Sequence, residues 1–256
     1  MNLQPTDKTI WVVLPCYNEQ DNLVPLITRF ENNFVQLLNL GFKREYIIVD
    51  DGSKDNSPAI LRELQTLIPL EVITHNPNQG LGATIRDGLK RAAERSDKLD
   101  IIITMDSDNS QPPELIGSMV QKILEGNHVV VASRYRYGAR VVGLVWYREW
   151  MSIIAGILFK LSYNIRNIRD YTCGFRAYES AHLKKAFEHY GDKFIEQTGF
   201  QCMAEIIIKL NRIENTLFYE VPMVLRYDMK EGESKMKVYK TVINTLRMLI
   251  SYKFKR

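Results

Sequence analysis

The sequence predicts an α/β protein built on a doubly wound, mostly parallel β-sheet of Rossmann-like type. Short apolar runs, typical of buried strands, occupy positions 10–14, 46–49, 70–74, 101–105 and 129–132. Amphipathic stretches of helical period lie between them, near 21–40, 56–67, 82–95 and 113–125. Strands that alternate with helices in this way favour parallel pairing, with helices on both faces of one sheet.

The second half of the chain follows another pattern. Aromatic and apolar residues with interspersed arginines fill 141–165, a helix is predicted near 199–212, and short β-like runs lie around 217–221 and 224–227. We interpret this half as a mixed extension of the sheet with helices that cover it. No repeat or low-complexity linker divides the 256 residues, which favours one α/β domain with an appended region.

Charge and cysteine content exclude several classes of protein. The chain has 34 Lys and Arg against 30 Asp and Glu, an excess too small to predict nucleic-acid binding. Arginines concentrate between 134 and 176, which indicates an anionic partner there. Three widely spaced cysteines predict neither a disulfide framework nor a zinc site, and favour a reducing, cytoplasmic compartment. We expect no signal peptide, and no apolar run reaches the roughly 18–20 residues of a membrane span.

The most informative segment is the apolar run at 101–105 together with the two carboxylates that follow it, Asp106 and Asp108. Open α/β sheets bind ligands at the carboxyl ends of their strands. Alternate residues of an extended segment point the same way, so both carboxylates can face one hard cation such as Mg²⁺ or Mn²⁺. The segment predicts metal-assisted handling of a phosphate; the alternative is that Asp108 only caps the next helix.

Polar motifs also follow the first two predicted strands. They are Pro-Cys-Tyr-Asn-Glu at 15–19 and Asp-Asp-Gly-Ser at 50–53. Strand-to-helix turns favour anionic or hydrogen-bonding ligands, although each motif alone is also ordinary turn chemistry. The segment 76–82 lacks the Lys-Ser/Thr pair of a P-loop. We therefore interpret its glycines as shaping a turn beside a nucleotide, and His75 as structural.

Taken in order, Pro-x-Tyr-Asn-Glu, Val-Asp-Asp-Gly-Ser, Asn-x-Gly-x-Gly, Asp-x-Asp and Ser-Arg-Tyr resemble family 2 of the glycosyltransferases, which has the GT-A fold. The likeness is closer to the polyprenyl-phosphate sugar synthases, a group that includes dolichol-phosphate mannose synthase. It continues through Asp-Tyr-Thr-Cys-Gly-Phe-Arg at 170–176, Glu-Val-Pro at 220–222 and Gly-Glu-Ser-Lys at 232–235. The match covers roughly residues 9–237.

The resemblance implies a role for each matching residue. Contacts to the nucleotide would come from Pro15, Tyr17, Glu19 and Asp50 or Asp51, with Gly80 beside it. Asp106 and Asp108 would hold Mg²⁺ or Mn²⁺ on the diphosphate. The acceptor phosphate would be bound by Arg134 and Arg148, and Lys235 would close over the donor.

Two positions depart from the family pattern. The metal motif usually has a Gln two residues after its second Asp, where this chain has Ser110. Gln111 follows and is assigned as the third metal ligand. In the terminal motif Met229 stands where the family has an Arg, so either Arg226 or Lys230 would make that phosphate contact.

A lipid phosphate is already an anion at neutral pH, so its attack on a sugar needs geometry and charge compensation but no general base. The resemblance implies inverting, metal-dependent transfer from a nucleotide sugar, of GDP-mannose or UDP-glucose type, to dolichyl or undecaprenyl phosphate. A saccharide hydroxyl as acceptor would need a base, for which Glu196 is the candidate. A nucleotide-sugar-binding protein without turnover is the second alternative.

Two segments predict a membrane surface as a partner. We expect a catalytic domain over 1–235 with an interfacial helical insertion about 141–165, although that segment suits a core or a dimer seam equally well. Residues 236–256 predict a basic amphipathic helix that binds anionic lipid or packs on the domain. We expect the protein to be associated peripherally with the cytoplasmic face of a membrane. The resemblance also allows a membrane-embedded partner subunit.

Overall fold

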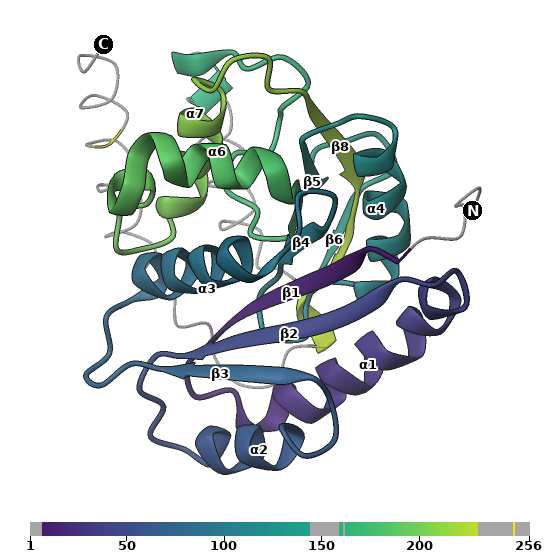
Figure 1. Cartoon of the computed structure of the whole chain (residues 1–256), viewed down its shortest axis with the longest axis vertical. Coiled ribbons are helices and arrows are strands. Elements are labelled where there is room, and N and C mark those ends of the chain that lie inside the picture. The colour runs from purple at the N-terminus through teal and green to yellow at the C-terminus, as the bar shows by residue number, and fades with distance from the viewer. Residues whose placement is uncertain (1–6, 144–158, 161, 230–247, 249–256) are drawn as a thin grey trace.

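The computed structural model describes residues 7–143, 159–160, 162–229 and 248, and its centre is a seven-stranded sheet (Figure 1). The strand order is β3-β2-β1-β4-β7-β5-β8. The strands are β1 (Thr9–Cys16), β2 (Lys43–Asp50), β3 (Leu70–Thr74), β4 (Ile101–Thr104), β5 (Val129–Ser133), β7 (Arg176–Glu179) and β8 (Phe218–Pro222). Only β7 runs antiparallel to its neighbours β4 and β5. The predicted α/β class and its mixed extension are confirmed.

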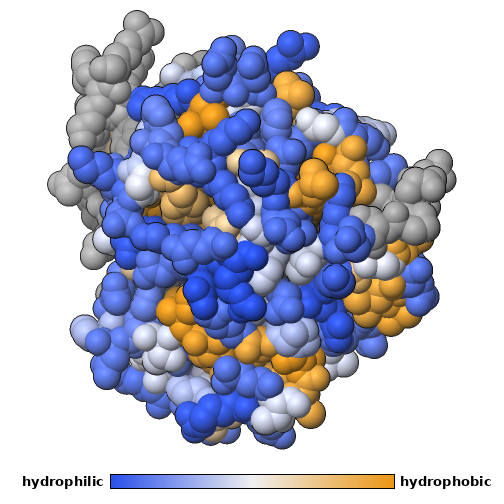
Figure 2. Space-filling view, viewed as in Figure 1, coloured by the Kyte–Doolittle hydropathy of each residue, from blue (hydrophilic) through white to orange (hydrophobic). Residues whose placement is uncertain are grey.

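Helices cover both faces of the sheet. They are α1 (Gln20–Asn39), α2 (Ser57–Leu64), α3 (Leu81–Arg95), α4 (Ile116–Leu124), α6 (Ser180–Tyr190) and α7 (Cys202–Leu210). Helices α3 and α6 contact each other on one face, whereas α1 contacts α2 and the 3-10 turn η1 (Pro113–Leu115) that precedes α4. On the face shown in Figure 2, hydrophilic residues dominate, and hydrophobic ones gather in the lower half near strands β2 and β3.

Helix α1 forms because its apolar residues recur every three or four positions. Leu23, Leu26, Phe30, Phe34 and Leu37 are all buried. Phe30 and Phe34 pack edge-to-face on a tyrosine of β2, with ring centroids 5.9 and 6.4 Å from its ring. This packing fixes the start of α1, directly after the motif at 15–19.

The apolar runs of β1, β2 and β4 explain why the polar motifs meet. All four residues of β4 are buried, and so are most of those in β1. β1 pairs in parallel with both β2 and β4. Their carboxyl ends therefore lie at one edge of the sheet, and the motifs at 15–19, 50–53 and 106–108 leave the sheet side by side.

Several boundaries differ from those predicted. β4 ends at Thr104, one residue earlier than expected. The helix expected over 113–125 begins as η1, and α4 starts only at Ile116. Pro113 suits this start, because the N–H of the first helical residue is not needed within the helix. Helix α6 and the 3-10 turns η2 (Gly191–Phe194) and η3 (Tyr227–Met229) were not predicted.

The insertion predicted over 141–165 is wrong at its first two residues. Positions 141 and 142 belong to β6 (Arg140–Val142), which pairs in parallel with β9 (Val224–Arg226) as a separate two-stranded sheet. Phe159 is buried and stacks on Tyr171 at 5.4 Å between ring centroids. Ile165 is buried as well, so these two residues complete the core, as the alternative proposed.

Much of the predicted membrane-facing sequence lies outside the described residues, namely 144–158, 161 and all of 236–256 except Met248. Met248 is buried and belongs to the hydrophobic core. Among the helices that the structure describes, none is both long and apolar enough to pass through a bilayer.

Candidate active site

Asp106 and Asp108 lie just beyond β4, and both are half-buried. The backbone N–H of Asp106 donates to Gln111 Oε1 at 3.1 Å, and its Oδ2 accepts from Gln111 Nε2 at 2.7 Å. The Oδ1 of Asp108 accepts from the hydroxyl of Ser110 at 2.6 Å and from its N–H at 3.2 Å. The loop therefore orients both carboxylates before any cation binds.

These bonds give Gln111 and Ser110 distinct tasks. The amide of Gln111 is bonded to Asp106 on both its edges, so the structure shows Gln111 as a support for that aspartate. Its role as third metal ligand stays a prediction. Ser110, at the position where the family usually has Gln, holds Asp108 instead.

The segment 170–176 packs directly against this loop. The hydroxyl of Thr104 donates to the carbonyl of Gly174 at 2.7 Å. A Cβ added at Gly174 would lie 3.0 Å from Asp106 Oδ1, so a side chain at this position would crowd the carboxylate. Glycine leaves that side of Asp106 open.

Arg134, which follows β5, is partly buried and forms a bidentate ion pair with the fully buried Asp170. Its Nε and Nη2 donate to the two carboxylate oxygens at 2.8 and 2.7 Å, and Nη2 also donates to the hydroxyl of Thr172 at 2.6 Å. Burial lowers the pKa of Arg134, but the Asp170 carboxylate outweighs it and raises that pKa. The Nη1 nitrogen has no hydrogen-bond partner among the described residues and is the edge that can bind a phosphate.

Backbone hydrogen bonds hold Asp170 in place. It is fully buried and also accepts from the backbone N–H groups of Arg134, Thr172 and Cys173. Glu220 on β8 accepts from the N–H groups of Arg169 and Asp170 at 2.7 Å each. Burial, together with the charge of Asp170, raises the pKa of Glu220, whereas the backbone hydrogen bonds from Asp170 and Arg169 lower it.

The charges of both the aspartate pair and Arg134 act on Tyr227, which no sequence motif pointed to. We call the ion pair of Arg134 with Asp170 the arginine clamp. Burial raises the pKa of the Tyr227 hydroxyl, and the charges of Arg134, Asp106 and Asp108 act on that pKa as well. These three groups therefore lie near enough to the phenol for their charges to act on it. Beside it, the N–H of Arg226 donates to the carbonyl of Ser110 at 2.9 Å, which ties the end of β9 to the aspartate loop.

The nucleotide-side motifs are joined to each other. The N–H of Asn18 donates to the hydroxyl of Ser53 at 2.9 Å, and the N–H of Lys54 donates to Asn18 Oδ1 at 2.7 Å. The carbonyl of Pro15 accepts from the hydroxyl of Ser107 at 2.7 Å. The three loops after β1, β2 and β4 thus form one continuous edge.

Carboxylates from two of these loops lie around the end of β1. Burial, followed by the charges of Asp50 and Glu19, raises the pKa of the Cys16 thiol to about 12. Glu19 is also held by the side-chain amide of Asn22 at 2.8 Å. Tyr17, which stands between Cys16 and Glu19 in the sequence, is half-buried. Pro15, Tyr17, Glu19 and Asp50 are thus together at the sheet edge, and their nucleotide contacts stay a prediction.

Both carboxylate oxygens of Asp51 accept hydrogen bonds from within the protein. They accept from the N–H groups of Gln79 and Gly80 and from His75 Nδ1, each at 2.8 Å. His75 continues to Asp87 at 3.0 Å, which confirms its structural role. Gly80 has φ +89°, and a Cβ there would lie 2.8 Å from the carbonyl oxygen of Thr198. Asp51 therefore shapes the glycine turn, which leaves Asp50 as the better candidate for a nucleotide contact.

The sequence profile described as "Glycosyl transferase family 2" matches residues 11–187. That stretch carries the aspartate pair, the Arg134 clamp and all the nucleotide-side loops. The chain belongs to glycosyltransferase family 2.

The family 2 chain resembles named relatives over most of its length. It is 31% identical over 237 residues to a dolichol-phosphate mannosyltransferase of Pyrococcus furiosus, a match that covers 92% of this chain and 61% of the relative. It is 27% identical to a UDP-N-acetylglucosamine–dolichyl-phosphate N-acetylglucosaminyltransferase of Methanococcus voltae, covering 94% of this chain and 96% of the relative. The chain thus spans about three fifths of the first relative and nearly all of the second.

A solved structure supports the fold. The mannosyltransferase of Pyrobaculum calidifontis, in complex with GDP-Man and Mn²⁺, superposes with a TM-score of 0.59 at 13% identity, covering 100% of this chain and 66% of that one. At this identity the likeness supports the fold alone. The predictions of family 2, of a glycosyltransferase and of the GT-A fold are confirmed.

Several residues predicted for the family 2 site are not part of this geometry. Arg148, Lys230 and Lys235 lie outside the described residues. Arg226 is described, and its exposed guanidinium is paired with Asp228 at 2.7 Å. Its role as a phosphate contact stays a prediction, because a phosphate would have to displace that carboxylate.

Glu196, the candidate base for a hydroxyl acceptor, is bound to a cation. Its Oε2 lies 2.9 Å from Lys209 Nζ, and Lys209 also pairs with the fully buried Glu205 at 2.7 Å. Glu205 in turn accepts from the N–H groups of Glu196 and Gln197. An adjacent ammonium favours the ionised form of Glu196 and so weakens it as a base.

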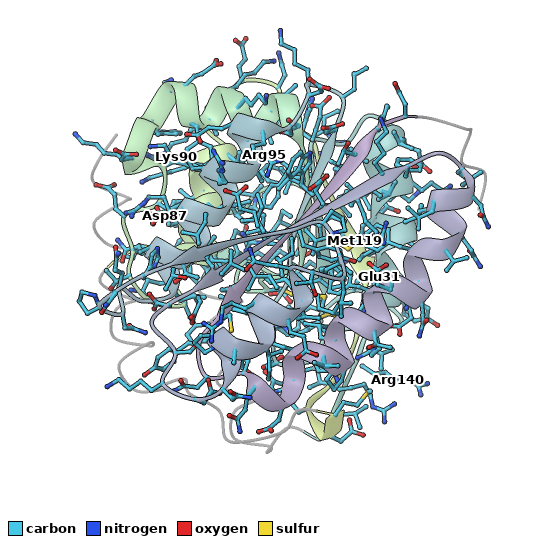
Figure 3. The ribbon with its side chains drawn as sticks, turned by 60° about the horizontal axis from the view of Figure 1, so that its bottom comes forward. Glu31, Asp87, Lys90, Arg95, Met119 and Arg140 are labelled. Carbon is cyan, nitrogen blue, oxygen red and sulfur yellow. The ribbon has the colours of Figure 1, made fainter. Side chains whose placement is uncertain are left out.

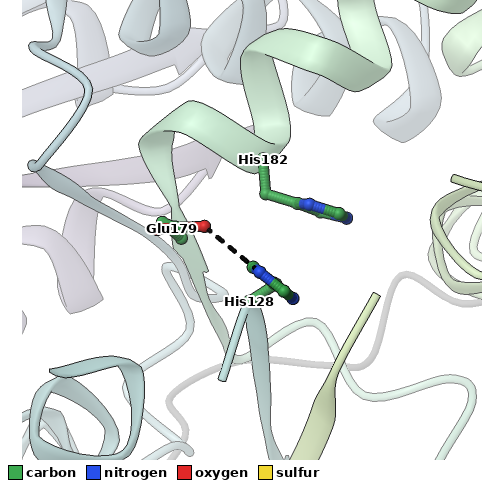
Figure 4. Close-up of side chains that lie close together, drawn as sticks. All are labelled: His128, Glu179 and His182. Carbon is green, nitrogen blue, oxygen red and sulfur yellow. Dashed lines mark ion pairs between the residues drawn. The ribbon is translucent and has the colours of Figure 1, made fainter. Parts of the chain in front are cut away.

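Three potential metal ligands of another kind lie at the opposite edge of the sheet. His128, Glu179 and His182 bring ligand atoms within 4.8 Å of one another (Figure 4). However, the two imidazoles stack at 4.4 Å between centroids, so their in-plane lone pairs do not converge. His128 Nδ1 also accepts from the N–H of Leu217 at 2.9 Å, which leaves the proton on Nε2. This cluster is not the predicted magnesium or manganese site.

Proposed function

We propose that this family 2 protein transfers a sugar from a nucleotide sugar to a polyprenyl phosphate. One observation carries the proposal: Asp170 holds two nitrogens of Arg134 in a bidentate ion pair, which orients a partly exposed guanidinium, and the charges of Arg134 and of the aspartate pair act on the same tyrosine. A hydroxyl acceptor would need a base at this place, whereas a phosphate acceptor needs a cation. The names of the relatives from Pyrococcus furiosus and Methanococcus voltae, both with dolichyl-type acceptors, support the same acceptor class here.

The site suits a hard divalent ion. Asp106, Asp108 and Gln111 offer oxygen ligands, the type that Mg²⁺ and Mn²⁺ prefer. Such an ion, when bound, would neutralise the charge that grows on the departing nucleoside diphosphate. The loop bonds from Gln111 and Ser110 hold the two carboxylates in place for it.

The other residues of the site would act by positioning the nucleotide and the acceptor phosphate. The nucleotide would lie along Pro15, Tyr17, Glu19 and Asp50. Arg134 would hold the acceptor phosphate through Nη1, since Asp170 occupies its other edge. A phosphate oxygen held there could attack the anomeric carbon from the side opposite the leaving diphosphate, with inversion. The hydroxyl of Tyr227, which is protonated at neutral pH, could donate to a phosphate oxygen.

Finer parts of the proposal concern donor, metal and place. We propose Mg²⁺ or Mn²⁺ as the ion, a GDP-mannose or UDP-glucose type donor, and work at the cytoplasmic face of a membrane. The Mn²⁺ bound in the Pyrobaculum calidifontis mannosyltransferase supports a divalent ion in this fold. A membrane partner follows from the lipid acceptor, and Arg148, Lys230 and Lys235 remain candidates for further phosphate contacts.

The proposal is tested by incubating the full chain with a panel of nucleotide sugars and a short polyprenyl phosphate, and measuring lipid-linked sugar. We expect product with one or two donors only, and loss of product on adding a chelator. The variant Asp108→Ala should lose metal-stimulated transfer by about a thousandfold or more while its circular dichroism is retained. Asp97→Ala, an exposed aspartate at the other edge, serves as the control. Full turnover of Asp108→Ala would refute the metal site.

A saccharide acceptor is the second candidate function. The ion pair of Glu196 with Lys209 does not favour this candidate. The same assay with sugar acceptors and the variant Glu196→Gln distinguishes the two. Transfer to sugars that disappears in Glu196→Gln would favour this rival over the lipid phosphate.

A further inference from the structure

The two-stranded sheet of β6 and β9 presents an outer face that no other described element covers. Its register pairs Arg140 with Val224 and Val142 with Arg226. These four residues are exposed, whereas Leu225 between them is buried. Because side chains alternate along a strand, the four exposed residues share one face, which we call the β6–β9 face.

The β6–β9 face also carries exposed apolar side chains. Val142 and Val224 are 38% and 41% exposed. Tyr137, in the turn that leads into β6, is 97% exposed, and Met229 just after β9 is 36% exposed. Amphipathic tyrosine and exposed aliphatic side chains together are typical of surfaces that meet the interfacial region of a bilayer.

The net charge of the β6–β9 face and its rim is positive. Arg136 and Arg140 have no acidic partner among the described residues, and the stretch 134–143 contains no Asp or Glu, although Arg136 lies over the ring of Tyr219 on β8 at 5.6 Å. Arg226 is balanced by Asp228 at 2.7 Å. Figure 3 shows Arg140 projecting away from the body of the protein beside β9. A surface of arginine, tyrosine and valine complements anionic lipid headgroups and not an acidic protein groove, because the apolar side chains alternate with the charges.

The face is also continuous with the candidate active site. Arg140 N–H donates to the carbonyl of Met223, and Met223 N–H donates to the carbonyl of Ser133, the residue before Arg134. Arg226 N–H donates to the carbonyl of Ser110. Backbone hydrogen bonds thus join the β6–β9 face to the residue before Arg134 and to the aspartate loop.

We infer that the β6–β9 face, with Tyr137 and Arg136 at its rim, docks on an anionic bilayer surface and sets the active site at the height of the headgroups. The inference rests on the proposed function for its purpose, since only a lipid acceptor requires this height. The docking itself needs neither donor nor acceptor.

The buried cysteines make a direct test practical. Cys16, Cys173 and Cys202 are all buried, so a maleimide dye should label only a cysteine introduced at the surface. Tyr137→Cys and Val142→Cys place an environment-sensitive fluorophore on the face. Leu217→Cys places it on a residue that is 55% exposed at the opposite edge of the sheet. Each full-length protein is mixed with vesicles of phosphatidylcholine and phosphatidylglycerol that contain no polyprenyl phosphate.

We expect the emission at 137 and 142 to shift to shorter wavelength on vesicle addition, and the emission at 217 to stay unchanged. Each basic residue near an anionic leaflet contributes about 1 kcal/mol, so Arg136→Gln with Arg140→Gln should weaken vesicle partition by roughly thirtyfold. Arg62→Gln with Lys98→Gln, two exposed cations away from the face, should leave it unchanged.

Vesicle binding without a shift at 137 and 142 would overturn the inference, and so would the absence of vesicle binding. Because the vesicles lack acceptor, the outcome is independent of turnover. A spectral shift in a protein that makes no lipid-linked sugar would refute the proposed function and keep the docking face.

Discussion

Arg134 and Asp170 show how much of the site depends on single contacts that the sequence does not reveal. The two residues are separated by 36 positions, and nothing in their spacing pairs them. Their motifs were both recognised, Arg134 as a phosphate ligand and Asp170 only as part of a matching string. The structure assigns Asp170 as the residue that orients Arg134, because a partly buried guanidinium without a carboxylate is costly.

We predict that Asp170→Asn raises the KM for polyprenyl phosphate by roughly tenfold or more and leaves the KM for the donor unchanged. The amide keeps the size of the carboxylate but no longer neutralises Arg134. Steady-state kinetics with each substrate varied in turn measure the split. Asp192→Asn, which removes an exposed ion pair with Lys90, is the matched control and should behave as wild type. Equal changes in both KM values would mean that Asp170 is merely structural.

Tyr227 is the second residue that sequence reasoning missed, since a tyrosine after a short strand has no motif of its own. Its hydroxyl is protonated at neutral pH, as any tyrosine is with its ordinary pKa of about 10, and burial raises that pKa further. We expect Tyr227→Phe to lower kcat by roughly tenfold with little change in donor binding, as for loss of one hydrogen bond to a charged group. Rapid-quench turnover measures the effect, with the half-buried Tyr163→Phe as the control. Wild-type kcat in Tyr227→Phe would remove the tyrosine from the site.

At the scale of elements, apolar continuity made the parallel strands predictable. The runs at 46–49, 70–74 and 129–132 each lie within a strand of the structure. By contrast, β6 is only three residues long and pairs with β9 more than eighty positions away, and neither property leaves a local pattern. Helix α6 was missed because two of its four buried residues, Ser180 and His182, are polar, and only Leu183 and Ala186 leave an apolar periodicity.

Packing between elements is most demanding where α3 meets the loop before α7. A Cβ added at Gly82 would lie 1.7 Å from the carbonyl oxygen of Gln197, a backbone atom. The N–H of Gly82 donates to the carbonyl of Thr198 at 3.0 Å. The glycine is therefore required by close approach of two backbones, and not by its own φ.

We predict that Gly82→Ala destabilises the protein by about 2–3 kcal/mol, since overpacking against backbone forces the helix and the loop apart. Thermal unfolding followed by circular dichroism checks this. Gly126→Ala, where nothing lies within 4 Å of the added Cβ and only a positive φ is strained, should cost about 1 kcal/mol. A smaller effect at Gly82 than at Gly126 would contradict the packing described here.

At the scale of the whole molecule, the two edges of the sheet have different chemistry. The carboxyl edge gathers the aspartate loop, the arginine clamp and the nucleotide-side loops. The opposite edge holds the stacked imidazoles, where His182 Nε2 lies 2.7 Å from the hydroxyl of Thr216. His128 precedes β5, His182 lies in α6, and Leu217 precedes β8. The contacts of the two histidines therefore connect β5, α6 and β8 at the edge of the sheet opposite the candidate site.

The stacked pair makes the stability of the whole fold depend on pH. Burial, then the charges of His128 and Lys185, lowers the pKa of His182 from 6.5 to about 4. Between these two values the unfolded chain binds a proton that the folded protein excludes, so stability is lost as pH falls from about 6.5 to 4. Glu179 lies 3.7 Å from His128. We expect the melting temperature to fall steeply across this window in the wild type. The fall should be shallower in His182→Gln, because the amide can still donate to Thr216 but does not titrate. The control His189→Gln changes an exposed histidine of the same helix and should leave the fall in melting temperature unaltered. If His182→Gln followed the wild-type curve, the acid sensitivity would belong to other groups.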